Sequence, residues 1–171
     1  MASSINLQLA NIPDELKTRP QWVAWRYEER DGKQTKIPKN PRTGGNAEAD
    51  NPSTWASMQE ALIATERYGF DGIGFEFSKD DPYCGIDFDK CFDPDSGELE
   101  PWARKYVELF SSYTEISPSG TGLHVIAKGK LPFREGKKGT GRKKGKFEVY
   151  DRERFFTFTG NIFHGNGSNR A

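Results

Sequence analysis

The sequence predicts an α+β protein in which a mixed or antiparallel sheet is covered on one side by helices. A length of 171 residues suits one domain with a real core. Most apolar segments alternate with a period of two residues, which is typical of strands, and only a few have helical character. The chain contains no internal repeat, so we expect a single core built on a sheet.

The N-terminal segments predict one short helix and two extended stretches. A helical turn is expected over residues 12–19, opened by Pro13 and ended before Pro20. A strand rich in aromatic residues follows over residues 22–27. Residues 36–45 are basic and contain prolines, and they are expected to be extended because proline pushes the preceding residue out of helical geometry.

A longer helix is predicted from Asn51 to Gly69. Asn51 is a plausible N-cap, with Pro52 at the first helical position. Apolar residues then recur at helical spacing, namely Trp55, Met58 and Leu62. Gly69 is a natural end, because glycine readily adopts the left-handed conformation that closes many helices.

The second half of the chain predicts mostly strands. Residues 73–77 and 83–89 alternate, and we expect them to pair as a hairpin around residues 78–82. Pro101 opens a helix that runs to Phe110. Four more strands are expected over residues 114–116, 123–127, 146–150 and 154–159, with a frayed end after His164.

Composition narrows the classes of function. Cys84 and Cys91 lack the spacing of a zinc site, and the chain has 2 histidines, so no zinc is expected. Residues 1–4 lack the charged and then apolar pattern of a signal peptide. No apolar stretch approaches the length of a membrane span. We therefore expect a soluble, intracellular protein with no membrane partner.

Charge is unevenly distributed along a chain whose formal net charge is zero. Residues 80–100 contain eight acidic residues and one lysine, whereas residues 128–146 contain nine basic residues and one acidic residue. An acidic metal-binding region beside a basic segment fits a substrate made of nucleotide phosphates and Mg²⁺. Two solvated loops that attract each other account for the charges equally well.

Asp87 and Asp89 are the most informative residues of the chain. They alternate with Ile86 and Phe88 in a predicted strand, so both carboxylates are expected on one face. Close carboxylates repel each other unless a cation lies between them, and a divalent ion is the usual solution. The pair is also compatible with a calcium loop, although its spacing fails the EF-hand pattern, and with a charged edge strand that discourages aggregation.

Three further polar residues lie on predicted strands among apolar neighbours, namely His124, Glu148 and Arg154. His124 follows a glycine-rich turn whose backbone N–H groups are able to hold an anion. The Arg154 guanidinium fits phosphate oxygens with two parallel hydrogen bonds. Each residue alone is equally compatible with an ordinary strand position or a surface ion pair. If the strands are neighbours in one sheet, Asp87, Asp89 and Glu148 converge to hold two metal ions roughly 3.5–4 Å apart.

The order and spacing of three motifs resemble the catalytic domain of phage- and plasmid-type primase-polymerases (prim-pols), of the archaeo-eukaryotic primase superfamily. The first motif, an apolar strand ending in Asp-x-Asp, matches residues 86–89. The second, a turn of small residues followed by histidine, matches residues 117–124. The third, an apolar residue followed by a carboxylate, matches residues 147–148. The resemblance covers most of residues 20–163 and also takes in residues 36–38, 51–55 and 154–160.

The resemblance implies a prim-pol fold. An RRM-like catalytic part would cover about residues 81–163, a smaller N-terminal α/β part about residues 1–80, and a flexible tail residues 164–171. The catalytic residues that the resemblance implies are Asp87, Asp89, His124 and Glu148. The metal ligands among them are Asp87, Asp89 and Glu148. The nucleotide contacts that it implies are His124, Arg154, Ser119, Lys36 and Asn40.

The chain departs from the family pattern in three respects. Gly122 occupies the small position two residues before His124, so a hydroxyl is missing there. The ligands of the zinc-binding insert of many primases are absent, as are the helical region and the helicase that often follow the catalytic domain. De novo primer synthesis by this chain alone is therefore not predicted.

The function that the resemblance implies is template-directed nucleotidyl transfer, as a DNA polymerase or primase, in replication of a phage, plasmid or other mobile element. It implies two Mg²⁺ or Mn²⁺ ions, dNTP or NTP substrates, template–primer DNA, and a helicase encoded downstream or in the same polyprotein, in the cytosol of a bacterial or archaeal host. The basic segment 128–146 would hold DNA phosphates, and Trp22, Trp25 and Tyr27 are candidates for base stacking. A metal-dependent nuclease and a non-catalytic single-strand nucleic-acid-binding module remain open.

Overall fold

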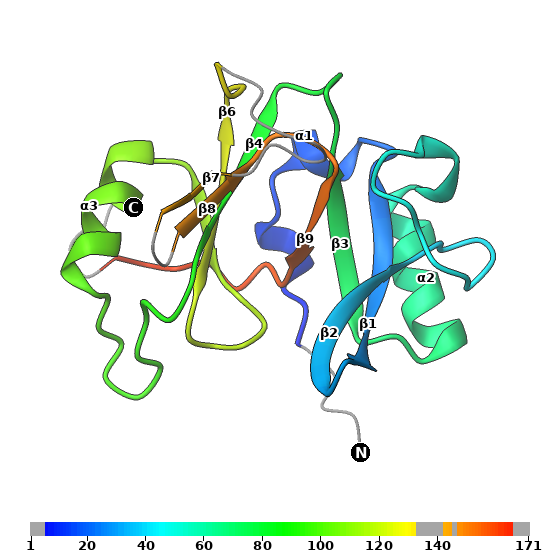
Figure 1. Ribbon diagram of the computed structural model, residues 1–171, viewed down its shortest axis with the longest axis horizontal. Helices are drawn as coiled ribbons and strands as arrows, with labels where there is room; N and C mark the ends of the chain where they lie inside the picture. Colours follow the sequence, from blue (N-terminus) through cyan, green and yellow to red (C-terminus); the bar gives the residue numbers. More distant parts are fainter. Residues whose placement is uncertain (1–5, 133–141, 145–146, 166–171) are drawn as a thin grey trace.

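The chain folds into two antiparallel sheets with two longer helices. The computed structural model describes residues 6–132, 142–144 and 147–165. Its elements in chain order are η1 (Leu9–Asn11), α1 (Asp14–Lys17), β1 (Trp22–Arg30), β2 (Lys33–Lys39), η2 (Pro52–Thr54), α2 (Met58–Tyr68), β3 (Gly72–Phe77), β4 (Tyr83–Phe88), α3 (Pro101–Phe110), β5 (Tyr113–Ile116), β6 (Leu123–Lys128), β7 (Arg142–Lys144), β8 (Phe147–Tyr150) and β9 (Arg154–Phe158). The first sheet has the order β2-β1-β3-β9 and the second the order β5-β6-β4-β8-β7. Figure 1 shows α3 and α2 at opposite ends of the view, with the two sheets between them.

The α+β class is confirmed, and the predicted strands are found, but the single sheet is replaced by two. The stretch expected to be extended over residues 36–45 ends as a strand at Lys39 and turns over residues 41–45, and β7 was not predicted. All neighbouring strands are antiparallel. β9, the last strand, pairs with β3 and not with the strands that precede it. The first sheet therefore contains segments from both ends of the chain, and β9 returns across from the second sheet to complete it.

The predicted hairpin between β3 and β4 is wrong, because the two strands lie in different sheets. β3 has β1 on one side and β9 on the other, and β4 has β6 and β8, so neither strand has a free edge for the other. Residues 78–82 carry the chain between the sheets. The buried Asp81 carboxylate orders this connection by accepting hydrogen bonds from the backbone N–H groups of Ser78 and Tyr83.

The predicted start of the long helix is also wrong. Asn51 does act as an N-cap, but of the short η2. α2 begins after Ser57, whose hydroxyl accepts from the Glu60 N–H while the Glu60 carboxylate accepts from the Ser57 N–H. This reciprocal capping box satisfies two backbone donors and marks the true start. Gly69, with φ of 65°, ends the helix as predicted. No helix among the described residues is long and apolar enough to cross a membrane.

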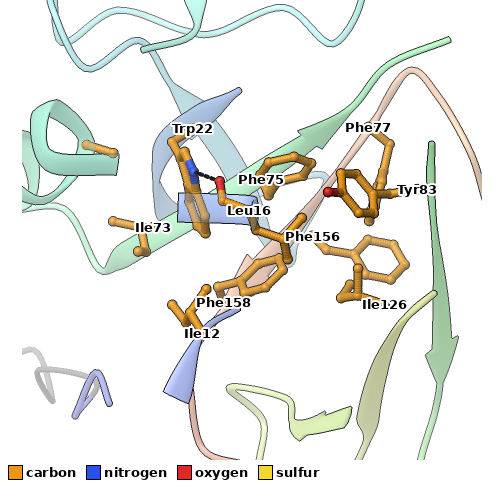
Figure 2. Close-up of a cluster of buried hydrophobic side chains, with 11 residues drawn as sticks. Ile12, Leu16, Trp22, Ile73, Phe75, Phe77, Tyr83, Ile126, Phe156 and Phe158 are labelled. Atoms are coloured by element: carbon orange, nitrogen blue, oxygen red, sulfur yellow. Dashed lines mark hydrogen bonds between the residues drawn. The ribbon is translucent and has the colours of Figure 1, made fainter. Parts of the chain in front are cut away.

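A mostly aromatic core joins the two sheets, and Figure 2 shows its side chains converging. Its members come from both sheets, from the N-terminal helical segment and from α2: Ile12, Leu16, Trp22, Ala61, Ile73, Phe75, Phe77, Tyr83, Ile126, Phe156 and Phe158. The indole of Trp22, which is 0% exposed, donates to the Leu16 carbonyl at 2.9 Å. Edge-to-face ring contacts, such as that of Trp22 with Phe75, add specificity to the area that is buried.

A second core lies on the other face of the second sheet, beneath α3. Its buried members are Cys84, Ile86, Phe88, Cys91, Leu99, Ala103, Leu123, Val125 and Ala127. Every second residue of β4 and β6 belongs to this cluster, as strand alternation requires. The residues between them point to the face that meets the first sheet, and the candidate site is built there.

Glu76 on β3 is a buried carboxyl group. Its side chain is 0% exposed, and neither of its oxygens has a hydrogen-bond partner among the described residues. Burial raises the pKa of Glu76 to about 8, which the Arg154 charge opposes and the Asp50 charge reinforces. The group is therefore neutral at neutral pH, because ionising it would leave an unpaired charge in the interior.

Glu76→Gln is expected to remove a pH dependence of stability. Since the pKa of Glu76 is raised from 4.5 to about 8 in the folded state, the stability of the neutral form is fully present below pH 4.5 and is lost as pH rises through 8. The stability of the variant should match that of the wild type near pH 4.5 and exceed it by up to about 1.4 kcal/mol for each pH unit from there to about pH 8, with no further gain above that. Urea unfolding at several pH values measures the difference. The exposed control Glu98→Gln should not change the pH profile, and parallel profiles for wild type and Glu76→Gln would contradict the assignment.

Candidate active site

Four titratable side chains form a row across four neighbouring strands of the second sheet. In the register of β4, Asp87 lies opposite His124 of β6 on one side and opposite Glu148 of β8 on the other. On the outer side of β6, Glu115 of β5 lies opposite His124. Because directly paired residues of adjacent strands point to the same face, the row Glu115–His124–Asp87–Glu148 faces the first sheet.

β4 is a central strand of the second sheet. Asp87 therefore does not serve as a charged edge residue that discourages aggregation, because β6 and β8 flank β4 on both sides. Asp89 follows the end of β4 and is exposed. Its charge and that of Glu148 both raise the pKa of Asp87, so the three carboxylates interact electrostatically.

Asp87 is destabilised in its ionised form. Burial is the largest cause of its raised pKa, followed in the opposite direction by the charge of His124. The charges of Asp89 and Glu148 raise the pKa further, and that of Lys36 lowers it. Repelling carboxylates in a partly buried place are a common feature of sites that bind cations, although they also occur in structural ion-pair networks.

His124 is held in place from both sides. It is 7% exposed, and its Nδ1 lies 3.1 Å from the carbonyl oxygen of Thr157 in β9. A carbonyl only accepts hydrogen bonds, so Nδ1 carries a proton and Nε2 faces the Asp87 carboxylate at 3.7 Å. His124 is therefore a buried residue with fixed neighbours, not an ordinary half-exposed strand position.

Glu148 and Arg154 are connected through an aromatic ring. The Tyr150 hydroxyl donates to the Glu148 carboxylate, and the Arg154 guanidinium lies over the Tyr150 ring, 4.6 Å from its centroid. Burial and the hydrogen bond to Glu148 raise the pKa of Tyr150 to about 12. The exposed Arg154 is thereby directed toward the end of the acidic row by a cation–π contact.

A pocket of about 360 Å³ lies between the row and the first sheet. Its lining residues come from strands of both sheets: Tyr27, Gln34, Thr35, Lys36, Asp87, His124, Arg154, Phe155, Phe156 and Thr157. Lys36 is half-buried, and burial lowers its pKa while the charges of Asp87 and Asp89 raise it. The pocket therefore combines carboxylate, imidazole, ammonium and guanidinium groups.

Two predicted nucleotide contacts, Asn40 and Ser119, lie outside the lining of this pocket. The Asn40 side-chain oxygen accepts from the Arg42 N–H at 2.9 Å and so orders the turn after β2. The Ser119 hydroxyl lies 2.9 Å from that of Ser117, within the turn that leads into β6. Both side chains have local structural partners.

Gly122 is required by packing in the same turn. A Cβ at this position would lie 2.7 Å from the carbonyl oxygen of Phe88, at the end of β4. Thr121 accepts hydrogen bonds through its carbonyl from the N–H groups of Cys91 and Phe92, which holds the turn against the chain after Asp89. The missing hydroxyl at position 122 therefore reflects a close backbone approach.

The basic segment 128–146 is described only in part, since residues 133–141 and 145–146 lie outside the described residues. Two of its lysines have structural partners. Lys128 pairs with Glu15 at 2.7 Å, and Lys130 donates to the Asp81 carboxylate and to the carbonyl oxygens of Ser78, Tyr83 and Asp151. The role of the segment in binding DNA stays a prediction.

The three aromatic candidates for base stacking differ in how far they are buried. Trp22 and Trp25 are 0% and 1% exposed, which leaves them no face for a base. Tyr27 is 41% exposed and lines the pocket, with its ring against the edge of Trp25. Among the three, Tyr27 is the residue with an accessible ring.

Sequence reasoning missed Glu115, which the structure adds to the row beside His124. It also missed Gln34, Thr35 and Thr157 in the lining of the pocket. Glu115 lies between Thr114 and Ile116 in a predicted strand, which is a weaker form of the alternation that singled out Glu148. That signal was available for Glu115, whereas the contribution of Gln34 and Thr35 depends on how the two sheets face each other.

The carboxylates suit Mg²⁺ or Mn²⁺ in chemistry. Asp87, Asp89 and Glu148 offer only oxygen ligands, which hard divalent cations prefer. A cation between them would also relieve the repulsion that raises the pKa of Asp87. Across the described residues, no three His, Cys, Asp or Glu side chains lie close enough to hold a metal ion.

The fold and the pocket define an α+β protein in which the Asp87 carboxylate, a histidine, a lysine and an arginine face one cavity, with Asp89 and Glu148 outside its lining. No family model matches the chain. It is 43% identical over 145 residues, 85% of its length, to a "DNA Primase-polymerase" of Nitratiruptor phage NrS-1, and it spans 20% of the length of that relative. The resemblance to phage-type primase-polymerases, which the motifs indicate, is confirmed.

Asp87→Asn is expected to stabilise the protein while weakening its response to metal. The substitution removes a carboxylate whose charged form is opposed by burial and by two neighbouring carboxylates. A gain of about 1 kcal/mol would raise Tm by roughly 2–4 °C for a domain of this size. Thermal melts with and without Mn²⁺ measure both effects.

The exposed turn variant Asp95→Asn is the matched control for Asp87→Asn. It should leave both Tm and the stabilisation by Mn²⁺ unchanged. Two results would contradict a cation site at the acidic row. One is a Tm of Asp87→Asn below that of the wild type, and the other is a rise in Tm with Mn²⁺ as large as that of the wild type.

Proposed function

We propose that this protein catalyses template-directed nucleotidyl transfer on DNA during replication of a phage, plasmid or other mobile element. The observation that carries the proposal is the register of β4, in which Asp87 is opposite both His124 and Glu148. Residues far apart along the chain thereby meet on one face. The similarity to a phage DNA primase-polymerase supports the same reaction class.

The acidic end of the row would hold the metal ions. Asp87, Asp89 and Glu148 would hold two Mg²⁺ or Mn²⁺ ions. Such ions, when bound, activate a primer 3′-hydroxyl and neutralise the leaving pyrophosphate. Tyr150 orients the Glu148 carboxylate through its hydroxyl, which keeps this ligand on the pocket side of the sheet.

The cationic side of the pocket would bind the triphosphate of a dNTP or NTP. His124 presents Nε2 on the Asp87 side, and Arg154 approaches from β9. Lys36 reaches the pocket from β2 in the other sheet. Three cationic or hydrogen-bonding groups from three strands therefore surround the place where phosphate oxygens would meet metal.

The nucleic-acid partners and the parts of the fold belong to the same proposal. The second sheet with α3 would correspond to the RRM-like catalytic part, and β1, β2 and β3 of the first sheet to the smaller N-terminal part, with β9 of the catalytic part added to that sheet. Residues of the basic segment 128–146 would hold template or primer phosphates, so DNA binding should weaken steeply with salt. A helicase acting with the protein in the host cytosol would open the template.

The double variant Asp87→Ala/Asp89→Ala is expected to abolish nucleotide incorporation with the fold intact, because it removes two of the three metal ligands. Extension of a labelled primer on a DNA template with Mn²⁺ and dNTPs measures activity, and circular dichroism measures the fold. Asp95→Ala/Glu98→Ala, which removes two exposed acidic residues nearby, is the matched control and should retain activity. Primer extension by the Asp87/Asp89 variant at the control rate would overturn the metal assignment.

The same labelled substrate separates the alternatives. Growth of the primer only when dNTPs are present indicates a polymerase. Shortening of the primer with Mn²⁺ alone indicates a nuclease. A protein that binds DNA regardless of divalent metal, and whose Tm is unchanged by dNTP with Mg²⁺, would be a single-strand binding module.

Tyr27→Ala is expected to raise KM for dNTP about tenfold, since stacking of a base on an aromatic ring contributes about 1–3 kcal/mol. Tyr27→Phe keeps the ring and should behave as the wild type. Tyr68→Ala, which removes an exposed ring on α2 outside the pocket lining, is the control. Steady-state incorporation measures KM and kcat, and an equal KM for Tyr27→Ala and the wild type would remove Tyr27 from the nucleotide site.

A further inference from the structure

Glu115 is a buried carboxylate at the far end of the row from Glu148. Its side chain is 1% exposed. Burying a carboxylate is costly unless hydrogen bonds compensate for the lost water. Glu115 receives such bonds from the Tyr113 hydroxyl at 2.7 Å and from the backbone N–H groups of Thr159 and Gly160 at 3.0 and 2.9 Å.

These hydrogen bonds join the two sheets beside the pocket. Glu115 belongs to β5 of the second sheet, whereas Thr159 and Gly160 directly follow β9 of the first sheet. Gly160 has φ of 69°, and a Cβ there would lie 2.1 Å from the carbonyl oxygen of Gln8, so this turn packs closely against the N-terminal segment and requires glycine. Glu115 therefore fixes where the end of β9 lies relative to β6.

The position of β9 determines what the His124 ring meets. The Thr157 carbonyl, two residues before Thr159, lies 3.1 Å from His124 Nδ1. A Glu115 carboxylate oxygen lies 3.7 Å from the same nitrogen. Both neighbours only accept hydrogen bonds, so they favour a proton on Nδ1 and oppose a flipped ring that would bring a carbon there. The Asp87 carboxylate, 3.7 Å from Nε2, favours a proton on the other nitrogen, so two acceptors at Nδ1 oppose one at Nε2.

We propose that Glu115 is a positioning residue that holds His124 as the Nδ1–H tautomer with Nε2 directed into the pocket. It does so directly, through its charge beside Nδ1, and indirectly, by holding Thr157 against the ring. Nε2 is then available on the Asp87 side of the pocket. The consequence for nucleotide binding rests on the proposed function, whereas the orientation of the ring does not.

Glu115→Gln tests the direct part with little change in shape. Its amide oxygen is able to accept from Gly160, Tyr113 and the Thr159 N–H, but its NH₂ group then faces Nδ1 and also lies beside the Thr159 N–H, which places donors against donors. Imidazole ¹⁵N NMR in alkaline buffer reports the tautomer. The chain has 2 histidines, so in a His164→Gln background every imidazole signal belongs to His124. We expect the ratio of Nδ1–H to Nε2–H tautomer to fall about tenfold in Glu115→Gln.

Thr159→Val is the matched control for loosening of the same junction. It removes the hydroxyl that donates to the Ile116 carbonyl at 3.0 Å but keeps the backbone N–H that binds Glu115. Its Tm should fall, while its tautomer ratio should stay within about twofold of the wild type. If Glu115→Gln does not fold, Glu115→Asp replaces it. That variant withdraws the charge from Nδ1, and a fall of about threefold is expected.

Kinetics adds a second readout in the full chain. KM for dNTP should fall severalfold in Glu115→Gln, because the Nε2–H tautomer that it favours presents a donor to phosphate oxygens, whereas a merely structural role would raise KM. A tautomer ratio in Glu115→Gln equal to that of the wild type, or an equal shift in Thr159→Val, would overturn the positioning role and leave Glu115 as a structural link. If the wild type incorporates no nucleotide but the tautomer shift occurs, the proposed function fails and the positioning of His124 by Glu115 stands.

Discussion

The placement of β4 between β6 and β8 is the constraint from which the rest of the candidate site follows. Ile86 and Phe88 are both 0% exposed in the core beneath α3. Because side chains alternate along a strand, the Asp87 carboxylate lies on the opposite face. A register shift of one residue would exchange these faces and bury the carboxylate in an apolar core. Packing of two apolar side chains therefore holds the Asp87 carboxylate opposite His124 and Glu148.

The pocket exists because a second sheet faces this row. The two sheets contribute groups of opposite charge to the pocket, with Asp87 on the second sheet and Lys36 on the first. Burial disfavours both charged forms, raising the pKa of Asp87 and lowering that of Lys36, and each charge partly offsets the effect on its neighbour. Such a balance is well suited to a ligand that carries both anionic phosphate and divalent cations, because each half would relieve one of the two penalties.

Sequence reasoning succeeded where one short-range pattern controlled the outcome and failed where two competed. Alternation placed His124 and Ile126 opposite Leu123 and Val125, and the structure confirms it. The helix start went wrong because Asn51 and Ser57 are both good caps, and Glu60 completes the box only with Ser57. The hairpin failed because β3 and β4 are adjacent in sequence, yet each already has two other partners.

The sequence by itself determined which residues face away from the apolar cores, because strand alternation is a local rule that tertiary packing rarely breaks. It also carried the resemblance to the primase-polymerases, through the order of three motifs. Only the tertiary structure decided that β9 crosses to the first sheet, that Lys36 and Tyr27 meet Asp87 across a pocket, and that Glu115 lies beside His124. These contacts join strands that are distant along the chain, and their partners are chosen by the packing of whole faces, which no short segment of sequence records.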